Sequence, residues 1–171
     1  MTRSVNSAKG LLILEEEDFE LLETPGDSRG AKVIHLVHTV ESKYSIVMFY
    51  TNECEQCKII KPVLLSFVGN PTIQICMVNV YDPDSTNLIQ LSQKSSTPLQ
   101  HVPLIIFYIN GTPFKKYDGG YNISDFQTFV KNVMTEASKV KDTSTISEIP
   151  PYTIGKPNSS KVCYLTYQKA Y

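Results

Sequence analysis

The chain has 171 residues, of which 42% are hydrophobic and 19% are charged, and its formal net charge is −1. This length suits one globular domain with additional terminal segments. The balanced charge argues against nucleic acid and anionic membranes as partners, because both are bound through clustered positive charge. No apolar run approaches the roughly 20 residues that span a membrane. The N-terminal segment lacks the apolar core of a signal peptide, so we expect a cytoplasmic protein.

The N-terminal part predicts a flexible arm, a strand and a short helix. Residues 1–10 are polar and form the expected arm, and Leu11–Leu14 is an apolar run typical of a strand. The acidic run Glu15–Asp18 is expected on the solvated surface, and the turn residues of Thr24–Gly30 predict a loop. A short amphipathic helix is then expected, although β-branched residues disfavour it. Its apolar residues with helical spacing are Val33, Ile34, Val37 and Val40.

The central part predicts alternating strands and helices. Apolar runs indicate strands covered on both faces, and a proline inside the first helix is expected to kink it. The expected elements are a strand at Ser45–Tyr50, a helix at Cys54–Phe67 containing Pro62, a strand at Thr72–Val80, a capped turn at Asp82–Ser85 and a helix at Asn87–Gln93. The expected buried side of the first helix is Ile59, Ile60, Val63, Leu64 and Phe67.

The C-terminal part predicts a hairpin and a last helix. Pro103–Ile109 and Pro113–Tyr117 are joined by the turn dipeptide Asn110-Gly111. Ser124 is the expected N-cap of an amphipathic helix that carries Phe126, Phe129, Val130 and Val133. The order β-α-β-α-β-α-β-β-α predicts an α/β fold with one mixed central sheet and helices on both faces. We expect this domain over residues 11–138 and an extended C-terminal tail over 139–171.

The main candidate for chemistry is the cysteine pair Cys54-Glu55-Gln56-Cys57, which follows a buried strand and opens a helix. Backbone N–H groups and the helix dipole at a helix N-terminus favour a thiolate, which is the nucleophilic form of cysteine. Cys57 lies one turn later, where it can resolve a mixed disulfide by attacking Cys54. Lys58 favours the thiolate and Glu55 opposes it, so the charges leave the sign of the pKa shift open.

These features resemble the thioredoxin family over about Leu11 to Ser138. The segment Phe49–Lys58 is similar to the family's active-site segment, and Pro62 to the proline of its active-site helix. Val102-Pro103 is similar to the loop whose cis-proline lies against the cysteines and pairs with substrate backbone. Gly119 or Gly120 is similar to the glycine that flanks the substrate groove. The resemblance therefore implies the thioredoxin fold, catalytic Cys54 and Cys57, substrate binding by Val102, Pro103 and Gly119, and disulfide-bonded proteins as substrates, without a cofactor or metal.

Four positions depart from the family pattern. The tryptophan before the first cysteine is Glu53, and the Gly-Pro between the cysteines is Glu55-Gln56. The buried aspartate that helps to deprotonate the second cysteine falls at Met48. Loss of this proton acceptor is expected to slow the second step of exchange. These changes are compatible with exchange chemistry and argue against efficient general reductase activity.

Other residues carry alternatives. Cys76 lies in an apolar run and is expected in the core. Cys163 is interpreted first as inert, with a reactive tail thiol or a regulatory partner for Cys54 as alternatives. His35 and His38 are expected to be solvated or hydrogen-bonded and not to hold a metal, and His101 borders the predicted groove.

The C-terminal stretch Val162–Tyr171 is absent from a minimal thioredoxin. It is similar to the tails of thioredoxin-like virion proteins of nucleocytoplasmic large DNA viruses, which adds the virion to the expected locations. The tyrosines of the tail suit an interface with a partner or with the chain's own sheet edge. Two functions therefore remain open: a thiol–disulfide oxidoreductase, or a virion, minor capsid or assembly protein on a thioredoxin scaffold.

Overall fold

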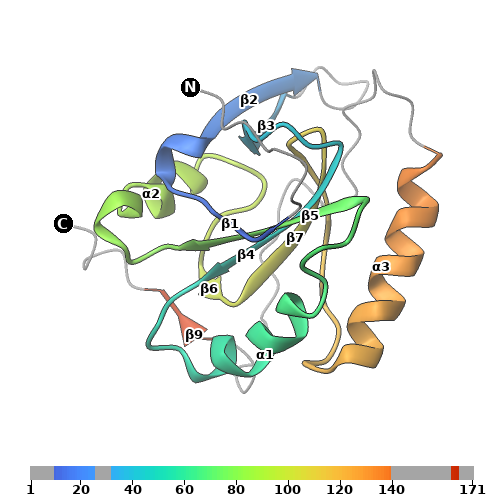
Figure 1. Cartoon of the computed structure of the whole chain (residues 1–171). Coiled ribbons are helices and arrows are strands. Elements are labelled where there is room, and N and C mark those ends of the chain that lie inside the picture. The colour runs from blue at the N-terminus through green and yellow to red at the C-terminus, as the bar shows by residue number, and fades with distance from the viewer. Residues whose placement is uncertain (1–9, 26–31, 140–162, 166–171) are drawn as a thin grey trace.

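The computed structural model describes residues 10–25, 32–139 and 163–165 (Figure 1). Its centre is a five-stranded sheet of order β1-β5-β4-β7-β8. These strands are β1 (Leu12–Ile13), β4 (Tyr44–Tyr50), β5 (Ile73–Asn79), β7 (Leu104–Ile109) and β8 (Thr112–Lys116). The middle strand β4 is parallel to β5 and antiparallel to β7. The predicted α/β class with a mixed central sheet is therefore confirmed.

The segment predicted as a short helix around Val33 to Val40 is instead part of a hairpin. β2 (Phe19–Pro25) and β3 (Lys32–His38) pair antiparallel, with Phe19 opposite His38. The helical interpretation is wrong because β3 is buried on both sides at its end, from His35 to His38, which hides the alternation of a strand. The β-branched residues agree with the strand, because their restricted χ1 lowers helix propensity and raises β propensity.

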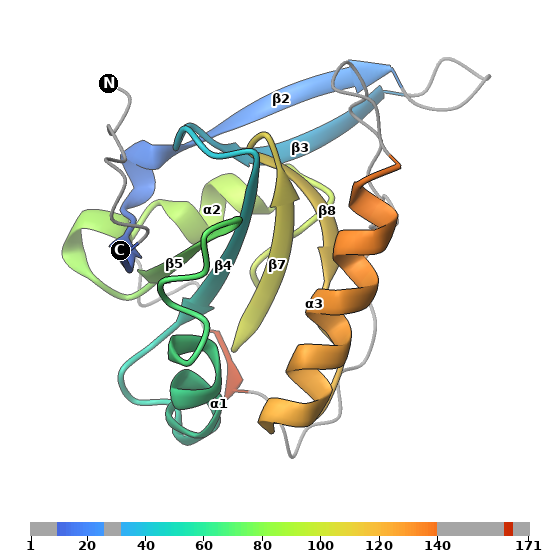
Figure 2. The ribbon, with the colours of Figure 1, turned by 45° about the vertical axis from the view of Figure 1, so that its right-hand side comes forward.

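The β2–β3 hairpin packs on one face of the sheet, beside α2 (Leu88–Ser92) (Figure 2). The rings of Phe19 and Phe49 lie 5.6 Å apart, and His38 is hydrogen-bonded to Ser45. Alternation along β4 then turns Ile46 and Met48 to the other face. Both of these side chains are fully buried. The continuous apolar run of β4 is thus explained by cover on both faces.

The opposite face of the sheet carries α1 (Glu55–Leu65) and α3 (Ile123–Ala137) (Figure 2). The ring of Phe126 on α3 lies 4.9 Å from that of Phe67, just after α1, and 5.1 Å from that of Tyr117. This aromatic cluster fastens the last helix to the end of α1 and to the end of β8. Helices therefore lie on both faces, as predicted.

Three local predictions differ from the structure. Asp18 closes the 3-10 helix η1 (Glu16–Asp18) and is buried, and its carboxylate accepts the Glu15 backbone N–H at 2.9 Å. Ile59 is 52% exposed, since it lies off the buried stripe of α1 formed by Cys57, Ile60, Val63 and Leu64. The N-cap of α3 is Asn122 and not Ser124, and its side chain accepts the Asp125 N–H at 2.8 Å.

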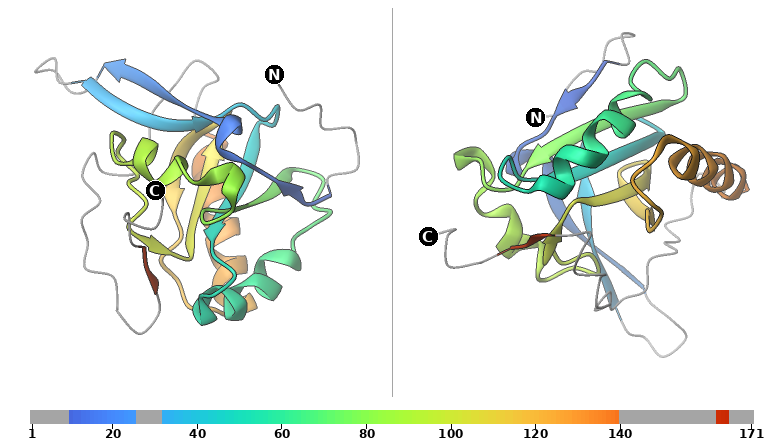
Figure 3. Two further views of the ribbon diagram at one scale, coloured as in Figure 1. Left: turned by 90° about the vertical axis from the view of Figure 1, so that its left-hand side faces the viewer. Right: turned by 90° about the horizontal axis from the view of Figure 1, so that it is seen from below.

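The remaining described elements are η2 (Pro83–Ser85), β6 (His101–Val102) and β9 (Cys163–Tyr164). β6 and β9 form a separate antiparallel pair, and Figure 3 shows β9 beside the segment that leads into β7. Most of the predicted arm (1–10) and tail (139–171) lies outside the described residues. Among the described residues, no helix is long and apolar enough to cross a membrane.

Candidate redox site

Cys54 lies at the junction between the central strand and α1. It is the N-cap residue of α1, with extended backbone angles, and its carbonyl accepts the Lys58 N–H at 3.3 Å. The residue is 3% exposed. The position predicted for this cysteine, at the start of a helix after a buried strand, is therefore confirmed. The N–H groups of the first helical turn, which lack a partner within a helix, lie next to it.

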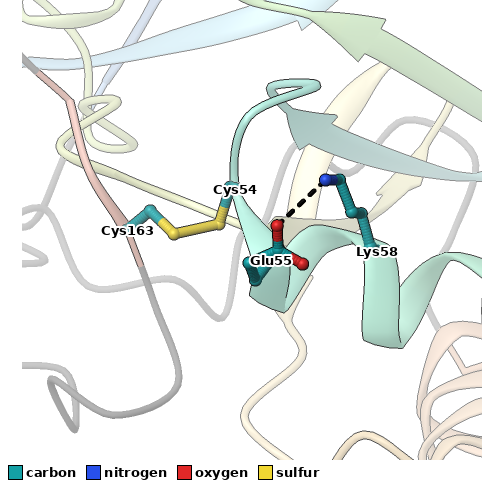
Figure 4. Close-up of polar contacts among 4 residues, drawn as sticks. All are labelled: Cys54, Glu55, Lys58 and Cys163. Atoms are coloured by element: carbon teal, nitrogen blue, oxygen red, sulfur yellow. Dashed lines mark hydrogen bonds and ion pairs between the residues drawn. A yellow bond between two sulfur atoms is a disulfide. The ribbon is translucent and has the colours of Figure 1, made fainter.

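Cys54 is bonded to Cys163 in a disulfide, with the two Cα atoms 6.0 Å apart (Figure 4). The bond joins positions separated by 109 residues in the sequence. The interpretation of Cys163 as an inert residue is wrong, and the alternative of a partner for Cys54 agrees with the structure. The sequence allows an interface of the tail with the chain's own sheet edge, but nothing in it assigns Cys163 to a particular neighbouring strand.

The disulfide lies against the proline loop. The Val102–Pro103 peptide bond is cis, in agreement with the resemblance. The Sγ of Cys54 lies 3.8 Å from the carbonyl oxygen of Val102. Directly opposite Val102 in the β6–β9 pair is Cys163 itself. The structure therefore brings together three positions that the sequence keeps far apart: Cys54, the proline loop and Cys163.

Backbone pairing continues on both sides of this contact. Tyr164 lies opposite His101, and the Leu165 N–H donates to the Gln100 carbonyl at 2.9 Å. Leu165 is buried in the hydrophobic core of the domain, and Val102 is fully buried. The described tail residues thus form an antiparallel strand along the edge predicted to hold substrate backbone.

Cys57 is a free thiol, 2% exposed, on the buried stripe of α1. Burial raises its pKa to about 11, and a backbone hydrogen bond from Thr51 partly opposes this rise. The pKa of Tyr121 is raised to about 12 by burial and by the charge of the Cys57 thiolate. Met48, at the position of the family's buried aspartate, is fully buried and cannot accept a proton. Cys57 is therefore held strongly in the thiol form.

The two charged residues beside the cysteines neutralise each other. The Lys58 Nζ donates to Glu55 Oε1 at 3.0 Å, and both side chains are exposed (Figure 4). An exposed ion pair of this kind has little effect on a neighbouring group. The two charges predicted to act in opposite senses on the cysteine thiolate thus form one ion pair on the surface of α1.

Gly119 lies beside the ring of Tyr117, and a Cβ atom there would be 2.5 Å from the tyrosine Oη. The Tyr117 hydroxyl donates to the carbonyl of Gly120, the residue that follows Gly119. The predicted roles of Gly119 and of Pro103 in substrate binding stay predictions.

The remaining candidates lie inside the fold. Cys76 is fully buried on β5, as predicted, and burial raises its pKa to about 12. His35 lies 3.0 Å from the hydroxyl of Thr24, and His38 2.6 Å from that of Ser45, so both histidines are hydrogen-bonded. Among the described residues, no three His, Cys, Asp or Glu side chains are grouped as metal ligands.

The Thioredoxin family model matches residues 33–132, more than half of the chain. The chain belongs to the thioredoxin family. The matched range includes both helix cysteines, the proline loop and Gly119, and it ends before Cys163. The fold is similar to that of a mutant thioredoxin from Halobacterium salinarum NRC-1, with a TM-score of 0.50 at 12% identity over 81% of this chain and 99% of that one.

Two viral proteins are similar to this thioredoxin-family chain over nearly its whole length. Uncharacterized protein 020R of Invertebrate iridescent virus 3 is 56% identical, covering 97% of this chain and 99% of its own. Uncharacterized protein 196R of Invertebrate iridescent virus 6 is 38% identical, covering 94% and 93%. The likeness to 020R thus extends well beyond the residues that the family model matches, and it agrees with the predicted similarity to viral thioredoxin-like proteins.

Proposed function

We propose that the chain is a protein thiol–disulfide oxidoreductase in which Cys54 is the attacking cysteine. The observation that carries this proposal is the setting of Cys54, at the N-terminus of α1 and against the Val102 carbonyl, in a disulfide with a cysteine on a paired extended strand. This is the geometry expected of an enzyme joined to a peptide substrate through a mixed disulfide. Proteins with accessible disulfides on extended segments are the proposed substrates.

In the first step, the Cys54 thiolate attacks one sulfur of a substrate disulfide. A Cys54–substrate disulfide forms, and the second substrate sulfur leaves as a thiolate and takes a proton from solvent. The helix N-terminus favours the attacking thiolate, because its N–H groups and dipole stabilise negative charge. The edge at His101 and Val102 holds the substrate backbone as an added strand.

In the second step, Cys57 attacks the Sγ of Cys54. The Cys54–Cys57 disulfide forms, the bond to the substrate breaks, and the substrate leaves with both of its sulfurs reduced. Only about one Cys57 in ten thousand is a thiolate at pH 7, given its pKa of about 11. The second step is therefore slow at neutral pH, and mixed disulfides last longer than they would beside an internal base.

A structural role on the same scaffold is the second candidate. One observation favours it: Cys54 is buried and bonded to Cys163, as in a disulfide that only ties a tail to a domain. In this role the tail serves as an attachment to virion, capsid or assembly partners, and Cys54 does not exchange. The two candidates differ in the chemistry of Cys54, which an exchange assay measures.

The assay mixes the reduced full-length chain with a disulfide-bonded peptide and follows the appearance of peptide thiol. The matched control is Cys76→Ala, which removes a buried cysteine outside the site. We expect Cys54→Ser to slow exchange by at least about 1000-fold, because the nucleophile is lost, and Cys76→Ala to stay within about twofold of the unaltered chain. Equal rates for the unaltered chain and for Cys54→Ser would overturn the proposal and favour the structural role.

A further inference from the structure

We propose that Cys163 is a third redox-active cysteine and that its strand is a tethered substrate of Cys54. This inference rests on the exchange activity proposed above and names the built-in occupant of the same site. Three independent contacts of the described tail residues place them there: a covalent bond, a backbone pairing and a buried side chain.

The disulfide to Cys54 and the strand pairing with Val102 both involve Cys163. Cys163 is bonded to Cys54 and lies opposite Val102, whose carbonyl oxygen is 3.8 Å from the Cys54 Sγ. A strand that pairs here uses the backbone groups of β6 that a substrate strand needs. The bonded tail and an external peptide therefore exclude each other at this edge.

The buried side chain of Leu165 indicates which peptide sequence the site prefers. Leu165, two positions after Cys163, is packed into the core, and its N–H donates to the Gln100 carbonyl at 2.9 Å. In an extended strand, positions i and i+2 point to the same face, so Cys163 and Leu165 both turn toward the domain. The site therefore accepts an extended segment with a cysteine followed, two positions later, by an apolar side chain.

Release of the tail needs only Cys57, the free cysteine of the site. The Cys57 thiolate attacks Cys54 Sγ, the Cys54–Cys57 bond forms as the Cys54–Cys163 bond breaks, and Cys163 leaves as a thiolate that takes up a proton. The number of disulfides does not change, so no external oxidant or reductant is consumed. An external peptide thiol can displace Cys163 in the same way and become bonded to Cys54.

The test uses the full-length Cys57→Ser chain, in which the internal release is blocked. Oxidised protein is equilibrated with acetyl-Cys-Tyr-Leu-amide or with acetyl-Cys-Tyr-Asp-amide, quenched with acid, and analysed by mass spectrometry for peptide bonded to Cys54. The two peptides have closely similar thiols, so a difference between them reports on the position of Leu165. We expect the leucine peptide to displace Cys163 at least about tenfold better than the aspartate peptide.

Three further chains keep the test informative if Cys57→Ser folds poorly. In the unaltered oxidised chain, peptide mapping is expected to find both Cys54–Cys163 and Cys54–Cys57 bonds. In Leu165→Ser, which keeps all cysteines, we expect the share of Cys54–Cys163 to fall by about tenfold, because the buried anchor is lost. The Cys163→Ser chain is mixed with glutathione disulfide to measure Cys54 exchange without the tail cysteine.

The outcomes separate this inference from the proposed function. If Cys163→Ser exchanges with glutathione but the two peptides bind equally and the Cys54–Cys163 bond is absent, the tethered substrate is refuted and the oxidoreductase stands. If Cys54 exchanges in neither the unaltered chain nor Cys163→Ser, the oxidoreductase is refuted and the tethered substrate with it.

Discussion

Each end of β4 lies next to a buried group of side chains, one held by hydrogen bonds and the other by a disulfide. Near its start, Ser45 lies 2.6 Å from His38 Nε2, while His38 Nδ1 accepts the Val40 N–H at 3.2 Å. Beyond its end, Cys54 is buried against Val102 and bonded to Cys163. The first group joins residues close in sequence through hydrogen bonds, which form on folding without any covalent chemistry. The second joins distant residues through a bond that a thiol can exchange.

The His38 group is expected to act on stability, and the Cys54 group on disulfide exchange. The ring of His38 has a fixed tautomer, because Nδ1 accepts a hydrogen bond and Nε2 must then donate to Ser45. Under the proposed function, Cys54 in contrast changes its bonded partner, and the strand that carries Cys163 exchanges with substrate at the same edge. Disturbing the first group should change stability, and disturbing the second should change exchange. The predictions below test this separation, from the largest expected effect to the smallest.

Gly111→Ala should cause the largest loss of stability. The glycine has φ +83°, and a Cβ there would lie 2.2 Å from the His38 carbonyl oxygen, a backbone atom that cannot move alone. We expect a loss of about 4 kcal/mol in the free energy of unfolding, measured with urea. Gly69→Ala is the control, since φ is +95° there but nothing lies within 4 Å. That variant should lose only about 1–2 kcal/mol, and equal losses would contradict the role of the contact.

The His38 group should make the domain sensitive to acid. Burial lowers the pKa of His38 to about 4 from 6.5, so between these values the unfolded state binds a proton that the folded state does not. The free energy of unfolding should therefore fall as the pH falls from about 6.5 to 4, by about 3 kcal/mol from this group. His38→Gln should show a smaller fall, and comparing the two chains cancels the carboxylates they share. Parallel pH profiles would contradict the prediction.

Release of the tail by Cys57 should be faster in base. Because burial raises the pKa of Cys57 to about 11, each pH unit below that value lowers its thiolate about tenfold. The rate at which Cys54–Cys163 converts to Cys54–Cys57 should rise about 100-fold from pH 7 to pH 9, followed by acid quench and mass spectrometry. A rate independent of pH would show that another step limits the exchange.

The smallest effect is expected at the exposed ion pair of α1. Glu55→Gln removes the partner of Lys58, yet both side chains are largely exposed. We expect the free energy of unfolding to change by at most about 0.5 kcal/mol. Lys58→Gln serves as the matched control and should behave alike. A change in the free energy of unfolding well above about 0.5 kcal/mol in either variant would contradict the weak contribution expected of this exposed ion pair.

The sequence was sufficient for the central sheet and for the position of Cys54. The apolar run Ser45–Tyr50 and a cysteine at a helix start are local signals. The structure places them in β4 (Tyr44–Tyr50) and at the N-cap of α1, as predicted. The hairpin strand Lys32–His38 was missed because burial on both sides gave it a helical spacing of apolar residues. The bond between Cys54 and Cys163 was only an alternative to an inert Cys163, because no local pattern shows which distant strand pairs with β6.

The central claim is that the disulfide of Cys54 exchanges in the folded protein. The most direct test is equilibration of the full-length chain in glutathione buffers of graded potential, with free thiols alkylated and the disulfides mapped by mass spectrometry. We predict reversible titration of Cys54 with a defined midpoint and with both Cys163 and Cys57 found as its partners. A Cys54–Cys163 bond that stays unchanged at every potential until the protein unfolds would contradict the account and make this disulfide a structural link.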